Sequence, residues 1–174
     1  KRAITRDIRT RAAKRRERAV TDIEALGWPE RALRVKDLMS RAPLAVGLDT
    51  PVGRAWKQMQ TRKIRHLPVL EGRRLAGIVS DRDLRQVILE PAIQEQLGNM
   101  SRALNILTVR DVMTWGVVSV RPDADVRRAA QMLREQRISA LPVVEGDRLV
   151  GILTATDIIR GSVELLDEGV LSKR

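Results

Sequence analysis

The chain has 174 residues and a mass of 19.6 kDa, long enough to bury a core without disulfides or a structural metal. Its 33 Lys and Arg residues exceed its 22 Asp and Glu residues by 11, and 43% of its residues are hydrophobic, which indicates a basic globular protein and excludes wholesale disorder. It has no cysteine and one histidine, His66, which excludes disulfides, thiolate chemistry and a multi-histidine metal site within one chain.

Composition also narrows the classes of partner. Tryptophan supplies all of the 2% aromatic content, so the stacking surfaces of single-strand and RNA-binding sheets are nearly absent and nucleic acid is a disfavoured partner. The longest apolar runs fall far short of the roughly 18 residues that a spanning helix needs, and the charged start does not resemble a signal peptide. We therefore expect a cytoplasmic protein that this chain does not anchor in a membrane.

Residues 1–34 form a basic segment with 11 Lys and Arg residues against 5 Asp and Glu residues. Apolar residues recur there at helical spacing, at Ile4, Ile8, Ala12, Ala19, Ile23 and Leu26, up to the helix stop Gly27-Trp28-Pro29. We expect a basic amphipathic N-terminal helix. It can be an arm that binds phosphate or a membrane surface, or it can pack its stripe on the rest of the chain, which is the interpretation we favour.

From residue 35 onward the chain contains two copies of one sequence, offset by 74 positions without a gap. Both copies open with V-x-D-x-M, at Val35–Met39 and at Val109–Met113, and both continue through L-P-V, E-G and G-I. Between residues 35 and 85, 19 of 51 positions are identical to their partners, against roughly three for unrelated sequences. The chain is therefore an internal duplication.

Each copy is predicted to fold as a β-α-β-β-α unit. A short apolar strand, 44–46 or 117–120, precedes a helix with one buried stripe. Thr50-Pro51, with proline at the first helical position, and Asp123-Ala124-Asp125 are the start signals of these helices. Two strands joined by an E-G hairpin follow, and a last helix begins at the [ST]-x-x-D sequence of Ser80–Asp83 or Thr154–Asp157.

Four features are present twice at equal spacing: the V-x-D-x-M opening, the L-P-V strand, the E-G hairpin and the [ST]-x-x-D junction that follows G-I. Together they resemble a tandem pair of cystathionine-β-synthase (CBS) domains, the assembly called a Bateman module. The resemblance covers residues 35 to about 165 and implies an α/β (α+β) fold of two units packed through their sheets, commonly as a homodimer. The layout is also similar to that of small bacterial two-domain proteins grouped with the acetoin-utilisation accessory protein. We accordingly divide the chain into an arm (1–34), a first CBS domain (35–96), a linker (97–108), a second CBS domain (109–165) and a tail (166–174).

The strand-to-helix junctions are the candidate ligand sites. A helix N-terminus presents unpaired N–H groups that suit phosphate, the Ser80 or Thr154 hydroxyl can add a hydrogen bond, and Asp83 or Asp157 can accept from ribose hydroxyls. The resemblance assigns the same roles to these positions, and it implies that backbone near the L-P-V strands and the opening loops holds the adenine. The candidate nucleotide-binding residues are Ser80, Arg82, Asp83, Thr154, Thr156, Asp157, Pro43, Leu44, Arg65, His66, Leu67, Val117, Val118, Ser139, Ala140 and Leu141.

Other interpretations of these residues stay open. The [ST]-x-x-D sequence is close to a capping box, which stabilises a helix by about 1 kcal/mol without any ligand. His66 fits a half-buried strand histidine better than a ligand contact, and Arg54 and Arg82 are phosphate partners or solvated residues. The two tryptophans Trp56 and Trp115 are expected to pack in a core or an interface. We favour the second junction for the ligand, because Asp81 adds a negative charge to the first.

The sequence predicts a non-catalytic regulatory module that binds an adenosine-containing ligand, of the AMP, ADP or ATP class, between its repeats and signals through the conformation of a dimer. No catalytic residue, metal site or obligatory cofactor is expected, since no nucleophile, metal cluster or carboxylate pair can be placed. We expect a homodimer, because helices near residues 52–59, 87–89, 126–133 and 158–166 should expose apolar faces, and a regulated protein partner or attached domain. The alternatives are a structural dimerisation module with empty pockets and a basic nucleic-acid-binding protein.

Overall fold

The computed structural model describes residues 33–89 and 104–171. The expected basic helix and most of the expected linker therefore lie outside the described residues. The chain divides into two compact units, of which residues 34–161 form one, and residues 1–33 together with 162–174 form the other. The first unit holds every candidate site residue and both repeats as far as Gly161 in helix α9 (Ala155–Leu171). The described part of the second unit is Leu33 and the end of helix α9.

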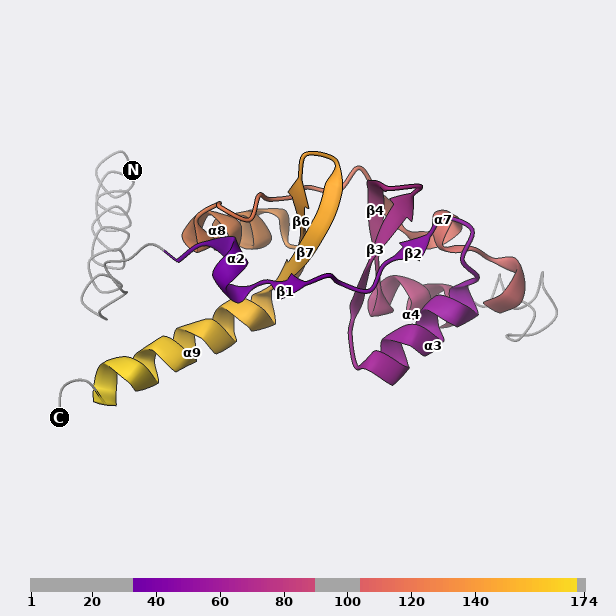
Figure 1. Cartoon of the computed structure of the whole chain (residues 1–174). Coiled ribbons are helices and arrows are strands. Elements are labelled where there is room, and N and C mark those ends of the chain that lie inside the picture. Colours follow the sequence, from indigo (N-terminus) through magenta and orange to yellow (C-terminus); the bar gives the residue numbers. More distant parts are fainter. Residues whose placement is uncertain (1–32, 90–103, 172–174) are drawn as a thin grey trace, which may run out of the picture. The chain divides into compact units, whose positions relative to one another are not determined.

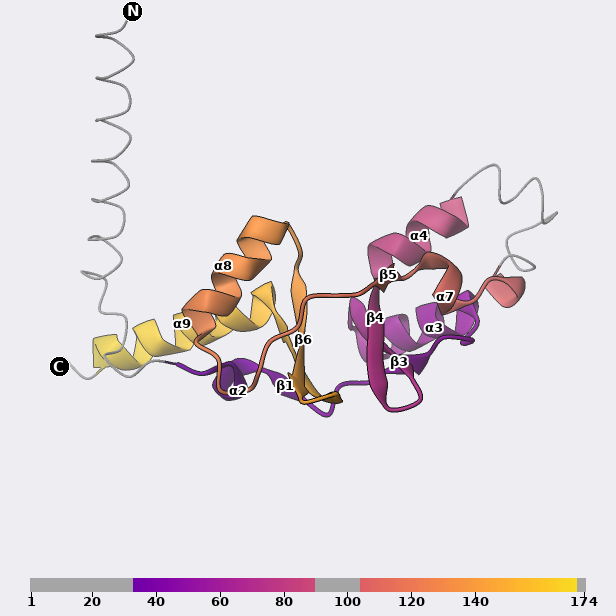
Figure 2. The ribbon, with the colours of Figure 1, turned by 90° about the horizontal axis from the view of Figure 1, so that it is seen from above.

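The two repeats have the same order of elements after their openings (Figures 1 and 2). The first repeat contains β2 (Val46–Gly47), α3 (Val52–Arg62), β3 (His66–Glu71), β4 (Arg74–Ser80) and α4 (Asp81–Leu89). The second repeat contains α8 (Val126–Gln136), β6 (Ala140–Glu145), β7 (Arg148–Thr154) and α9. The strand expected at 117–120 is reduced to one bridge between Val120 and Val143, where the first repeat has the parallel pair β2 and β3.

Each repeat is built around an antiparallel hairpin. Strand β3 pairs with β4, and β6 pairs with β7, in the same register and with the same irregularity after the L-P-V sequence. The turns place Gly72 at φ 62° and Gly146 at φ 59°, a left-handed conformation that glycine adopts without strain. The hairpins expected from the E-G sequences are confirmed.

The openings of the two repeats are exchanged. Helix α2 (Val35–Leu38) leads into β1 (Ser40–Arg41), which pairs with β7 of the second repeat, and α7 (Val109–Val112) leads into β5 (Thr114–Trp115), which pairs with β4 of the first. Figure 1 shows the exchange in its colours, since the indigo α2 and β1 lie beside the orange β7. Each V-x-D-x-M opening therefore completes the other repeat, although the sequence indicated that it begins its own.

Glycines in the receiving strands make room for the exchanged segments. A Cβ atom at Gly77 of β4 would collide with the Thr114 carbonyl oxygen, and one at Gly151 of β7 would collide with the Met39 sulfur. The aspartate of each opening caps its own short helix, because Asp37 accepts from the Arg34 N–H and Asp111 from the Thr108 N–H, both at 2.8 Å. The V-x-D-x-M sequence thus encodes a capped helical turn that ends in a crossing strand.

Two separate cores follow from this exchange. The first core gathers the apolar stripe of α3, the inner faces of β3 and β4, and Val109 and Met113 from the opening of the second repeat. The second core gathers the stripe of α8, the faces of β6 and β7, and Val35 from the opening of the first repeat. Trp56 packs against the first core, as expected, whereas Trp115 is 53% exposed, which leaves an interface as the expected environment of its ring.

Two predicted helix boundaries change and one is confirmed. Helix α3 begins after Pro51, which occupies the N-cap position, so proline does not stand at the first helical position and Thr50 makes no cap. Helix α8 begins after Asp125, whose side chain accepts from the Arg127 N–H, as the sequence predicted. Helix α9 continues to Leu171, beyond the expected domain boundary at residue 165.

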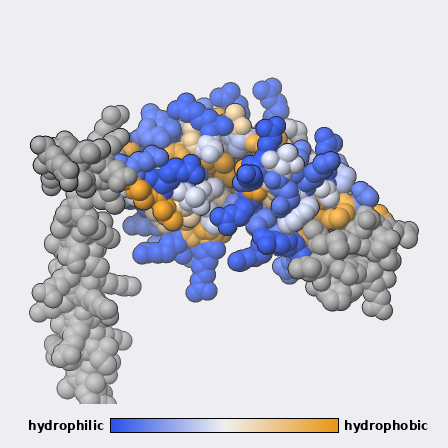
Figure 3. Space-filling model, turned by 90° about the horizontal axis from the view of Figure 1, so that it is seen from below, coloured by the Kyte–Doolittle hydropathy of each residue, from blue (hydrophilic) through white to orange (hydrophobic). Residues whose placement is uncertain are grey.

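The described residues on the face drawn in Figure 3 are mostly hydrophilic. Hydrophobic residues emerge there as patches among hydrophilic ones. The apolar stripes of α3 (Val52, Ala55, Met59) and α8 (Val126, Ala129, Leu133) are at most 5% exposed and belong to the cores of their own repeats, so the expectation that these helices present apolar faces is wrong. Helix α9 does present apolar residues, Ile159 at 65% and Val163 at 51% exposure. Across residues 33–89 and 104–171, no helix has the length and hydropathy needed to cross a bilayer.

Candidate ligand site between the repeats

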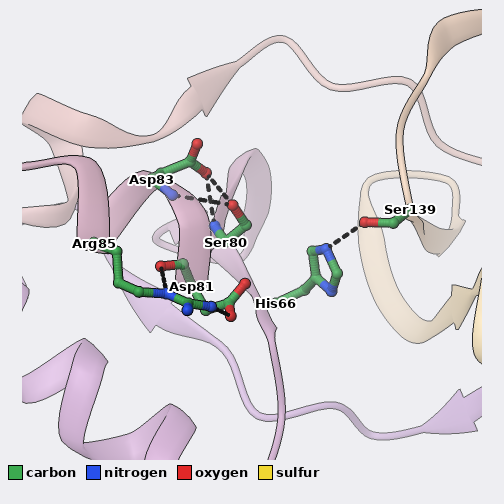
Figure 4. Close-up of polar contacts among 6 residues, drawn as sticks. All are labelled: His66, Ser80, Asp81, Asp83, Arg85 and Ser139. Atoms are coloured by element: carbon green, nitrogen blue, oxygen red, sulfur yellow. Dashed lines mark hydrogen bonds and ion pairs between the residues drawn. The ribbon is translucent and has the colours of Figure 1, made fainter.

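The first strand-to-helix junction is a closed capping box. Asp83 Oδ2 accepts from the Ser80 N–H at 2.8 Å and from the Ser80 hydroxyl at 2.7 Å, and the Asp83 N–H donates back to Ser80 Oγ at 3.3 Å (Figure 4). Ser80 therefore occupies the N-cap position of α4, and Asp83 the third helical position. The other carboxylate oxygen of Asp83 points away from the cap.

The second junction repeats this arrangement. Asp157 Oδ2 accepts from the Thr154 N–H at 2.8 Å and from its hydroxyl at 2.6 Å, and the Asp157 N–H donates to Thr154 Oγ1 at 3.2 Å. The capping interpretation of the two [ST]-x-x-D sequences is therefore confirmed. It leaves a ligand role open, because each cap uses one carboxylate oxygen and an aspartate carries two.

The two junctions differ in charge. Asp81, at the first position of α4, forms an ion pair with Arg85 one turn later, whereas the second repeat has Ala155 and Ile159 at these places. Arg85 is thus a cation that offsets the negative charge of Asp81 at the first junction. Arg82, the cation expected there, is exposed. The i, i+4 spacing of Asp81 and Arg85 is the sequence signal that could have revealed the pair.

The loops expected to hold adenine connect one repeat to the other. The Ala42 N–H still donates to Val150 of β7 at 3.3 Å, while Val46 already pairs with Val69 of the first repeat. In the second copy, Gly116 donates to Ala76 of β4 at 3.3 Å, and Val120 donates to Pro142 of the second repeat at 3.0 Å. The residues between these contacts, 43–44 and 117–118, therefore lie where the chain passes between the repeats, a zone we call the seam.

A side-chain hydrogen bond joins the two repeats at the seam. His66 Nε2, on β3, lies 2.9 Å from Ser139 Oγ, immediately before β6 (Figure 4). His66 pairs with Ser80 in the hairpin, and the Arg65 carbonyl accepts from the Asp81 N–H at 2.9 Å. On the other side, the Ser139 carbonyl accepts from the Ala155 N–H at 3.0 Å. The contact thus joins the strand partner of Ser80, the N-cap residue of α4, to the residue whose carbonyl accepts from the first residue of α9.

Burial sets the charge of His66. The ring is half-buried, and this desolvation lowers the pKa of His66 below its ordinary value. The negative charge of Asp81 acts in the opposite direction, Arg65 lowers the pKa further, and Asp83 raises it. A pKa below the ordinary value of about 6.5 makes the neutral imidazole the main form at pH 7. The interpretation of His66 as a half-buried strand histidine is confirmed.

The remaining candidate residues separate by burial. The side chains of Leu67, Ala140 and Leu141 are at most 5% exposed, so only their backbone can meet a ligand. Exposed or half-buried side chains belong to Pro43, Leu44, Arg65, Arg82, Val117, Val118 and Thr156. Among the described residues, no three His, Asp or Glu side chains come together as a metal site.

Comparison with known proteins identifies the repeats. The family described as the CBS domain matches residues 35–90 and 109–164, the two copies found in the sequence. The chain belongs to the CBS domain family. A CBS domain-containing protein of Dictyostelium discoideum is 30% identical over 135 residues, which cover 76% of this chain and 93% of that protein. Several other curated relatives are longer proteins, of which this CBS pair spans only 13–25%.

Solved CBS structures share the fold. A protein assigned to acetoin utilization (AcuB) from Vibrio cholerae is 33% identical with a TM-score of 0.66, over 79% of this chain and 95% of that chain. The CBS domain pair of protein MJ0100, solved with 5'-methylthioadenosine and S-adenosyl-L-methionine, is 26% identical with a TM-score of 0.63, over 75% and 95%. CBSX2, solved with AMP, is 29% identical with a TM-score of 0.63, over 76% and 97%.

Proposed function

We propose that this CBS pair binds an adenosine-containing ligand at the seam between its repeats and acts as a non-catalytic regulatory sensor. The observation that carries the proposal is its similarity to two CBS pairs solved with such ligands, AMP in one and S-adenosyl-L-methionine with 5'-methylthioadenosine in the other. The proposed contacts are the strand-to-helix junctions and the loops at 43–44 and 117–118.

The geometry of the junctions supports this placement. Each capping aspartate keeps its N-cap residue fixed with one oxygen and has a second oxygen to accept a ribose hydroxyl. The first turns of α4 and α9 carry the N–H groups that suit a phosphate or another anionic group. The loops at the seam add backbone donors and acceptors from both repeats, so a ligand held there contacts both at once.

A ligand at the seam can carry a signal because it contacts two bodies whose packing it can change. Ligand binding shifts an equilibrium only when the ligand prefers one arrangement over another. We propose that the preferred arrangement is read by a partner protein, by an attached domain or by a second copy of the chain.

The direct test is thermal unfolding of the full chain with AMP, ADP, ATP, S-adenosylmethionine and 5'-methylthioadenosine. A ligand at 100 times its dissociation constant stabilises the folded state by about 2.7 kcal/mol, which raises Tm by several degrees. GMP and CMP serve as controls for the base. If none of the adenosine compounds raises Tm more than these controls do, the junctions are helix caps only and the pair is a structural module.

The capping boxes dictate which variants test the contacts. Replacing Asp83 or Asp157 with alanine would remove the cap together with the ribose acceptor, so a loss of affinity would be ambiguous. Asp83→Asn and Asp157→Asn keep an oxygen for the cap and replace the outward oxygen with an NH₂ group, which cannot accept. We expect ligand affinity at the altered site to fall roughly ten- to hundredfold, the effect of about 1.5–3 kcal/mol for a charge-assisted hydrogen bond.

Titration calorimetry measures this change. Glu71→Gln, an exposed position at the end of β3 and outside the junctions, makes the same carboxylate-to-amide change in the same repeat and should leave affinity unchanged. Unchanged binding in the Asp83→Asn/Asp157→Asn double variant would place the ligand elsewhere on the molecule.

A further inference from the structure

The two repeats are not equivalent at the seam. The second repeat has Ala140 where the first has His66, and the first has Arg65 where the second has Ser139. The chain's single histidine therefore lies beside one junction only, and its hydrogen bond to Ser139 has no counterpart related by the duplication. Any proton uptake by an imidazole at the seam is confined to the first repeat.

Burial favours the neutral form of His66, while nearby carboxylates favour its charged form. Asp81 and Asp83 of α4 face it with negative charge, Asp81 being paired with Arg85, while Arg65 opposes protonation from the same strand. From the second repeat, the contact is the uncharged Ser139 hydroxyl. A hydroxyl can donate to a neutral imidazole nitrogen or accept from a protonated one, so the bond across the seam survives in both states.

An anion bound at the first junction would shift the protonation equilibrium of His66. The phosphate of a nucleotide at the first junction adds negative charge near a half-buried imidazole, where the effective dielectric is lower than in water. The cost of desolvating an imidazolium is then offset by attraction to the ligand. By linkage, if the ligand raises the affinity of His66 for a proton by some factor, protonation of His66 raises the affinity of the site for the ligand by the same factor.

We propose that His66 makes the first candidate site proton-coupled, so that a phosphate-bearing adenosine ligand binds there together with a proton, while the second site, with Ala140, binds independently of His66. This inference rests on the proposed function, and it makes His66 the group that distinguishes the two candidate sites of the module. The module would then respond to nucleotide and acidity jointly.

The first experiment follows His66 directly. Because the chain has one histidine, the carbon-bound imidazole protons give a single NMR titration curve between pH 4.5 and 8.5. We expect saturating AMP to raise the pKa of His66, and saturating adenosine, which lacks the phosphate, to leave it in place. Ser139→Ala tests the contact itself, since losing the partner at 2.9 Å should move the imidazole signals in the free protein.

The second experiment measures the proton with the ligand. Calorimetric titration with AMP in two buffers of different ionisation enthalpy gives the number of protons taken up per ligand. His66→Ala, which copies Ala140 of the second repeat, is the matched variant and also cancels the titration of the phosphate itself, whose second pKa is about 6. We expect proton uptake in the wild type to exceed that of the variant between pH 5.5 and 7.

The size of the effect follows from linkage. A rise of one unit in the pKa of His66 makes AMP binding at that site about tenfold tighter below both values than above them, relative to His66→Ala. AMP binding with an unmoved His66 titration and equal proton uptake in both proteins would overturn this inference and leave the proposed function standing. Absence of AMP binding, with no other adenosine compound bound, would instead overturn the proposed function.

Discussion

Asp157 and Asp83 each connect three polar groups at the start of a helix, and the free energy of this arrangement can be measured apart from any ligand. Removing the carboxylate leaves the N-cap residue's half-buried N–H without its acceptor. We expect Asp157→Ala to lower the free energy of unfolding by about 1–2 kcal/mol and Asp157→Asn by less, because the amide oxygen can still accept. Urea denaturation with no ligand present measures both. Equal losses in the two variants would mean that capping is not what the carboxylate contributes.

His66 also makes the stability of the folded chain depend on pH. Its pKa is lowered in the folded state, so between the ordinary value of about 6.5 and the lowered value the unfolded chain binds more protons than the folded one. The free energy of unfolding should therefore be highest above pH 6.5, fall as the pH decreases through this window, and level off below it. Chemical denaturation of the wild type and His66→Ala from pH 8 to 5 isolates this contribution. A wild-type curve parallel to that of the variant would contradict it.

At the scale of elements, the exchanged openings depend on two strand glycines. Gly77→Ala drives a methyl group into the Thr114 carbonyl oxygen, a backbone atom that cannot move aside, so we expect a loss of about 2 kcal/mol or more of stability. Gly47→Ala is the matched control, because its added Cβ would have no neighbour closer than Thr50 Oγ1 at 4.0 Å. The control should change stability by less than about 1 kcal/mol. Thermal unfolding followed by circular dichroism compares them; similar losses would show that close approach is not the reason for glycine.

The elements also show how far the sequence predicts the fold. Periodicity and turn residues predicted both hairpins, the helices α3 and α8 and both capping boxes. Each of these depends on residues close together in the chain. The exchange of openings was not predictable in the same way, because an apolar pattern such as that of Val35 and Met39 says that a segment is buried but not against which sheet. Glycine within β4 and β7 was the available signal of a close backbone approach. The His66 contact with Ser139 depends on the same long-range packing.

At the scale of the whole molecule, we expect a homodimer, for a narrower reason than the sequence indicated. The stripes of α3 and α8 are buried within the protomer, but Ile159 and Val163, one helical turn apart on α9, remain 65% and 51% exposed. A second copy would cover them. Light scattering should give twice 19.6 kDa at micromolar concentration, and Ile159→Glu/Val163→Glu should shift the mass toward one protomer. A wild-type mass of 19.6 kDa at this concentration would contradict the expectation.

The exchanged openings have one more consequence, for a chain cut in two. A fragment of residues 1–96 would contain α2 and β1, which complete the core of the second repeat, but would lack α7 and β5, which complete its own. A fragment of residues 97–174 would have the opposite deficit. Each half is thus a poor autonomous folder and a specific complement of the other. Co-expressed with an affinity tag on one half only, the fragments should purify together and unfold as one cooperative species, which makes this protein a natural starting point for split-reporter design.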